Sequence, residues 1–88
     1  MITEVKIGKW YQDSVWSSKQ DYIKVDSFTV ESTYIQCYGN VIDNSRYSTK
    51  QEWSIHLDST REVSIEEINQ YLSDELKENY INENLIYY

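Results

Sequence analysis

The apolar residues of this 88-residue chain change their spacing near residue 60, and this change limits the folds that the chain can adopt. Before it, apolar and polar residues alternate in short runs, which is typical of strands with one buried face. After it, apolar residues recur three or four positions apart, which is typical of a helix that buries one stripe. The sequence therefore predicts strands at the front and one helix at the back.

The alternating runs lie within residues 6–58. They are 6–12, 21–30, 33–38 and 52–58. The polar stretches 13–20 and 43–51 are predicted loops, and Gly39-Asn40 is a predicted turn. The predicted fold is α+β: a small antiparallel sheet or SH3-like barrel of about four to five strands, followed by one C-terminal helix.

The helix has clear signals at its start. Ser64 is a natural N-cap, and Glu67 three positions later completes a capping box. Val63 before the cap and Ile68 in the first turns match a hydrophobic staple. These signals predict that the helix begins at residue 65.

An apolar stripe predicts how far the helix continues. It consists of Ile65, Ile68, Leu72 and Leu76. The predicted helix spans about 65–78, with Asn79 as its stop, and 85–88 is predicted as an edge strand or docked tail. Residues 1–88 are expected to form a single domain, because the chain is too short for two.

Composition indicates a reducing cellular location. Cys37 is the single cysteine, which excludes an intramolecular disulfide, and no secretory signal or run long enough to span a membrane is visible. Ala and Pro do not occur and Gly occurs twice, which is typical of an AT-rich gene. We expect a cytoplasmic protein of a low-GC bacterial host or its phage, with no membrane association.

The sequence offers few groups for catalysis or metal binding. Cys37 and His56 are the single thiol and imidazole, and the strand pattern predicts that they point to opposite sides of the sheet. A structural zinc site needs four nitrogen or sulfur ligands. We therefore expect no enzyme, no catalytic residue, no metal and no cofactor.

Charge indicates a basic partner. Residues 61–88 hold seven acids and two bases, and the whole chain has a net charge of −7. Direct nucleic-acid binding is not expected, because that requires clustered Lys and Arg. One flank of the predicted helix carries Glu67, Tyr71, Asp74 and Glu78. Asp74 and Glu78 repel each other across one turn, and Glu78 opposes the helix dipole. This stripe could bind a host protein with a basic surface; alternatively, it is an ordinary solvated face that keeps the protein soluble.

Tyr34 and Tyr38 form a second candidate surface. If Ile35 and Cys37 face the core, the two rings face outward, where tyrosine is a common interface residue. The competing interpretation is that the helix covers this face, so that both faces of the sheet are buried.

Three segments carry a family resemblance. They are Ile7-Gly8-Lys9-Trp10-Tyr11, Tyr22-Ile23-Lys24-Val25 and Tyr34-Ile35-Gln36-Cys37-Tyr38. Together they resemble small SH3-like proteins of phages of low-GC bacteria, and the small acidic whole is similar in style to phage anti-defence proteins such as anti-CRISPR inhibitors. The resemblance implies an inhibitor of a host nucleic-acid-handling or defence protein that acts by partial nucleic-acid mimicry. The alternative is an SH3-like adaptor or oligomerisation module with an aromatic surface, and a homodimer is left open.

Overall fold

The computed structural model describes residues 1–18, 20–43 and 46–71, which form five strands and one helix. The elements are β1 (Trp10–Asp13), β2 (Tyr22–Val30), β3 (Ile35–Asp43), β4 (Arg46–Ile55), β5 (Thr60–Val63) and α1 (Ile65–Tyr71). The strands make one sheet in the order β4-β3-β2-β1-β5, and all neighbours are antiparallel. The α+β prediction is confirmed at this level.

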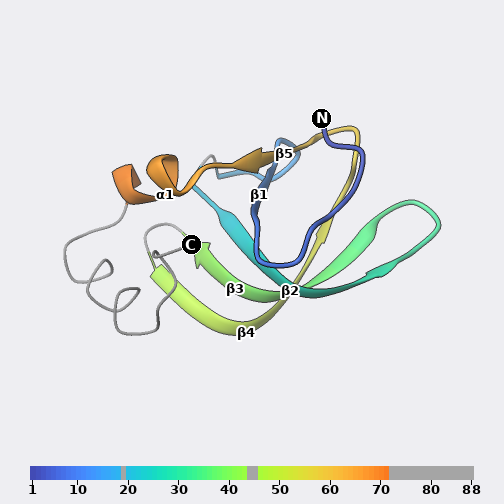
Figure 1. Ribbon diagram of the computed structural model, residues 1–88, viewed down its shortest axis with the longest axis horizontal. Coiled ribbons are helices and arrows are strands. Elements are labelled where there is room, and N and C mark those ends of the chain that lie inside the picture. Colours follow the sequence, from blue (N-terminus) through green and yellow to red (C-terminus); the bar gives the residue numbers. More distant parts are fainter. Residues whose placement is uncertain (19, 44–45, 72–88) are drawn as a thin grey trace.

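The sheet is strongly bent but does not close into a barrel (Figure 1). No ladder joins β4 to β5 among the described strands. The β2–β3 hairpin extends away from α1, which lies beyond β5 at the other end of the molecule. The described helix is too short to cross a membrane.

The predicted turn at Gly39-Asn40 is wrong, because β3 runs through it to Asp43. Gly39 lies opposite Val25 of β2, and a Cβ on Gly39 would stand 1.9 Å from the carbonyl oxygen of Lys24. Glycine is needed here for a close approach of two strands rather than for a reversal of the chain. The predicted loop 43–51 is also wrong for the most part, since β4 begins at Arg46.

Two irregularities in the pairing accompany this close approach. The register of β2 against β3 shifts between Val25 and Ser27, and that of β3 against β4 shifts between Gly39 and Val41. Lys50, in the second shift, has a φ of 55°. Bulges bend a strand and increase its twist. They therefore account for the sharp curl of the sheet.

The first and last strands also differ from the prediction. β1 begins at Trp10 rather than residue 6, because Gly8 turns the chain at a φ of 86° and donates its N–H to the carbonyl of Val25 over 2.7 Å. β5 was not predicted: it has four residues, too few to show an alternating pattern. It pairs with β1, with Trp10 opposite Val63.

The described residues form two core clusters on opposite faces of the sheet, as the alternation of side chains along each strand requires. The cluster under the helix contains Trp10, Tyr22, Ile42, Val63 and Ile68. The cluster on the other face contains Val5, Tyr11, Ile23, Val25, Ile35, Cys37, Val41 and Ile55. Trp16 and Trp53 pack against the second cluster and are only partly buried.

The predicted start of the helix is confirmed. Ser64 accepts the N–H of Glu67 on its Oγ at 3.1 Å and the N–H of Ile68 on its carbonyl at 3.2 Å, as an N-cap does. Val63 and Ile68 belong to one core cluster, as the staple predicts. The predicted continuation to residue 78, with Leu72 and Leu76, and the predicted strand or tail at 85–88 lie outside the described residues.

Candidate binding site

The curl of the sheet brings the end of β4 against the segment that follows β1. We call this line of contact, between residues 13–16 and residues 52–59, the seam. Two backbone hydrogen bonds lie in this region: the N–H of Ser14 donates to the carbonyl of Ser59 over 2.9 Å, one position beyond the Asp13–Thr60 pair of β1 and β5, and nearby the N–H of Ile2 donates to the carbonyl of Leu57 over 3.1 Å. Side-chain hydrogen bonds also link the two segments of the seam.

Asp13 is the centre of the seam. Its side chain is fully buried and accepts four hydrogen bonds. The donors are the N–H of Val15 (3.1 Å), the hydroxyl of Ser59 (2.6 Å), and the N–H and Nδ1 of His56 (2.9 Å each). Burial of the carboxylate opposes its ionisation, but the bonds from Ser59, His56 and Val15 outweigh burial and hold the pKa of Asp13 below its usual value. An ionised carboxylate with four donors ties β1 to the end of β4.

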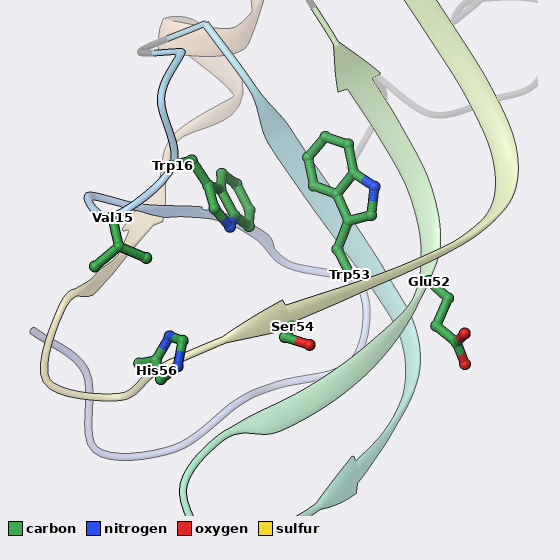
Figure 2. Close-up of a pocket in the computed structure, with 6 residues that line it drawn as sticks. All are labelled: Val15, Trp16, Glu52, Trp53, Ser54 and His56. Atoms are coloured by element: carbon green, nitrogen blue, oxygen red, sulfur yellow. The ribbon is translucent and has the colours of Figure 1, made fainter.

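A pocket of about 470 Å³ opens beside this network. It is lined by Val15, Trp16, Glu52, Trp53, Ser54 and His56. Figure 2 shows Val15 and Trp16, from the segment after β1, facing Trp53 and His56 at the end of β4. The two indole rings meet edge to face, with centroids 4.9 Å apart and planes at 78°. This geometry is favourable for aromatic pairs and leaves part of each ring exposed.

The turn after β1 explains why Trp16 reaches the pocket. The carboxylate of Asp13 accepts the N–H of Val15, and the carbonyl of Asp13 accepts the N–H of Trp16 at 3.2 Å. Such a turn reverses the chain without glycine. The two apolar side chains that follow Asp13 are thereby placed over the end of β4.

The outer side of β4 forms one wall of the pocket. β4 is an edge strand, paired with β3 on one side only. Among the described residues, no other strand pairs with Glu52, Trp53 or Ser54 on the outer side. An edge strand presents backbone N–H and C=O groups to any extended segment that lies against it.

The predicted tyrosine surface lies on the other side of β3 from Cys37. Ile35 and Cys37 are buried, whereas Tyr34 and Tyr38 are 36% and 37% exposed, so the two rings point away from the Cys37 core. The competing interpretation, that the helix covers this face, holds at the other end of β3, where both faces of the sheet are buried. The described part of α1 packs near Ile42 on this face, and neither Tyr34 nor Tyr38 belongs to a core cluster. Partial desolvation and the neighbouring carboxylate of Glu52 raise the pKa of Tyr38.

The acidic stripe is described only in part. Glu67 forms a bidentate ion pair with Arg61, with one N–O distance of 2.9 Å, and also accepts the hydroxyl of Tyr22 at 3.3 Å. These bonds lower the pKa of Glu67, and the hydrogen bond from Arg61 has the largest effect. Its charge is therefore offset within the fold. The side chain of Tyr71 is not described, and Asp74 and Glu78 lie outside the described residues.

The two groups weighed for catalysis do not meet. Cys37 is buried, and desolvation raises the pKa of its thiol to about 11. His56 lies in the seam with its Nδ1 on Asp13. Among the described residues, no three His, Cys, Asp or Glu side chains group as metal ligands do.

Sequence reasoning missed the seam and therefore the pocket. Asp13, Val15 and Trp16 fall in a stretch that reads as a polar loop, although two adjacent apolar residues in such a loop are a usable signal. The alternation within 52–58 puts Trp53 on the same side of its strand as Ile55, but the structure shows Trp53 only partly buried. The join between β1 and β4 depends on the curl, which pattern alone does not give.

Comparison with family models, curated proteins and solved structures finds no match for this chain.

Proposed function

We propose that this chain is a non-catalytic binding protein, an SH3-like adaptor that takes an extended segment of a partner protein along the outer edge of β4. The observation that carries the proposal is the pocket between that edge and Trp16. A segment lying there would pair with the backbone of β4 and insert a side chain against the two indoles. Aromatic side chains bury much area at low entropic cost and dominate many interfaces.

The inhibitor hypothesis stays a prediction. Its acidic stripe depends on Asp74 and Glu78, because the charge of Glu67 is already neutralised by Arg61. The cytoplasmic bacterial location and a homodimer also stay predictions. The binding site proposed at the seam is compatible with an inhibitor as well as with an adaptor, because both act by binding a protein.

A peptide selection tests the proposal. A library of displayed random 12-residue peptides is selected on the wild-type protein, and the enriched peptides are measured by calorimetry against two variants. Trp16→Ala should weaken binding at least about tenfold, since an anchoring aromatic contributes on the order of 2 kcal/mol. Tyr34→Ala, an exposed ring outside the pocket, is the matched control and should change binding less than twofold.

Two results would contradict the proposal. Peptides that bind Trp16→Ala and the wild type equally would show that the pocket is not the site. A loss confined to Tyr34→Ala would instead move the site to the tyrosine surface of β3.

A further inference from the structure

Three of the described side chains that line the seam pocket, Ser54, Glu52 and His56, present hydrogen-bond acceptors. Ser54 donates its hydroxyl proton to Oε1 of Gln36 over 2.7 Å, which leaves its oxygen free only to accept. Glu52 is a carboxylate that only accepts, and it already accepts the hydroxyl of Tyr38 from the neighbouring strand. The indole N–H groups of Trp16 and Trp53 and the backbone N–H groups of the β4 edge are donors, so it is a ligand side chain lying against Ser54, Glu52 and His56 that has to bring donors of its own.

His56 also presents a hydrogen-bond acceptor. Its Nδ1 lies 2.9 Å from the carboxylate of Asp13, whose lowered pKa keeps it ionised and unable to donate. The proton of the neutral ring must then sit on Nδ1, and Nε2 is left as an acceptor. The ring of His56 is 41% exposed, whereas Asp13 is fully buried, and His56 is among the residues that line the pocket.

The charges around the pocket also indicate which kind of ligand it favours. Among the described residues that line the pocket there is no Lys or Arg, and the charged side chain is Glu52, which extends away from the indoles in Figure 2. The carboxylate of Asp13 lies behind His56. The whole chain carries a net charge of −7. The local and the overall charge both favour a cation.

The apolar wall favours a particular kind of cation. Trp16 and Trp53 expose parts of their rings, and a guanidinium stacks on tryptophan while donating five hydrogens in its own plane. A volume of 470 Å³ falls within the range of ordinary side-chain and ligand pockets.

We propose that the seam pocket binds an arginine side chain of the partner segment, with its guanidinium against Trp16 and Trp53 and its N–H groups directed to Nε2 of His56 and Oγ of Ser54, near the carboxylate of Glu52. This inference rests on the proposed function and specifies the partner: an extended segment with a basic residue at its centre.

The probe is N-acetyl-arginine amide, titrated by NMR into the 15N-labelled protein at low salt. The neutral isostere N-acetyl-citrulline amide is the matched control. We expect saturable shifts of the Trp16 and Trp53 indole N–H signals, with the citrulline compound at least about fivefold weaker, as loss of a cation–π contact implies. Raising the salt concentration to 0.5 M should weaken the arginine compound selectively, since partly exposed charge pairs are screened.

Variants locate the interaction. Glu52→Gln should weaken the arginine compound about threefold, as expected for a rim charge. Glu66→Gln, an exposed acid on α1 outside the pocket, removes the same charge and should leave binding unchanged. Trp53→Ala should abolish saturable binding of the arginine compound. Circular dichroism shows whether this variant folds. If it does not fold, Glu52→Gln still tests the inference.

Several outcomes would overturn the inference. They are equal binding of the citrulline compound, tighter binding of N-acetyl-tryptophan amide, no saturable shift with the arginine compound, or an Nε2–H signal from His56 in the free protein at pH 7.5. The peptide selection separates this failure from failure of the proposed function. Selected peptides that depend on Trp16 but contain no arginine would refute the arginine inference and leave the peptide site standing.

Discussion

The tryptophans on the two sides of this small sheet differ in how far they are buried. Trp10, on the side under α1, is 2% exposed and lies among Tyr22, Ile42, Val63 and Ile68. Trp16 and Trp53, at the seam, pack on the core with one side only and leave a pocket open. The difference lies in what closes each region: a helix covers the first, whereas side-chain hydrogen bonds join the second. Trp10 is therefore excluded from solvent, whereas Trp16 and Trp53 stay partly exposed.

The test with the largest expected effect compares two substitutions, one on each side of the sheet. Trp10→Ala should lower the free energy of unfolding by about 4 kcal/mol, as expected when a fully buried aromatic leaves a cavity. Trp53→Ala should cost only about 1–2 kcal/mol, because its ring is already partly solvated. Urea denaturation followed by circular dichroism measures both. Equal losses would mean that the seam is core in the same sense as the helix side.

The second test removes the centre of the seam. Asp13→Ala leaves the N–H groups of Val15 and His56 and the hydroxyl of Ser59 without their acceptor, and we expect a loss of about 3 kcal/mol in the free energy of unfolding. Ser14→Ala, at the next position along the chain, is the control and should cost less than about 1 kcal/mol.

The pH dependence of the same variant sharpens the point. The pKa of Asp13 is lower in the folded protein than in the unfolded chain, where aspartate titrates near ~3.9. Its ionised form therefore stabilises the fold above about pH 4, and this stability is lost as the pH falls through the folded pKa. The gap between wild type and Asp13→Ala should narrow from pH 7 to pH 2.5. A constant gap would mean that the ionised carboxylate is not what holds the seam.

The third test concerns the bend that creates the seam. Gly39→Ala places a Cβ 1.9 Å from the backbone oxygen of Lys24, and we expect it to cost about 3 kcal/mol because two paired strands must separate. Gly8→Ala is the matched control: its Cβ meets nothing within 4 Å, and only its positive φ is penalised, by about 1 kcal/mol. Thermal unfolding ranks the two. A larger loss for Gly8 would show that the close approach at Gly39 tolerates a methyl group.

These residues also show what the sequence could predict. The helix start was predictable, because Ser64, Glu67 and Ile68 act within a single turn and depend on nothing distant. The alternation at Ile35 and Cys37 gave the correct buried face for the same local reason.

The failures concern contacts between distant segments. Glycine is common in turns, but Gly39 is needed because its strand approaches the backbone of Lys24, fifteen positions earlier. Asp13 and His56 are 43 positions apart and meet because the sheet curls and β1 pairs with β5, which follows His56 after a short turn. The pocket is a product of that curl, so no local pattern announces it. The acidic stripe was predicted from helical spacing and charge, and Arg61 neutralises the one carboxylate of it that the structure describes.

The most direct measurement is an NMR map of the surface on which a selected peptide binds. The peptide with the highest affinity is added to the 15N-labelled protein, and amide shifts are followed residue by residue. The seam account predicts that the largest shifts fall in residues 15–16 and 52–56, including the two indole N–H signals. Largest shifts in α1 and beyond it, with the seam unaffected, would contradict the account and favour the acidic helix instead.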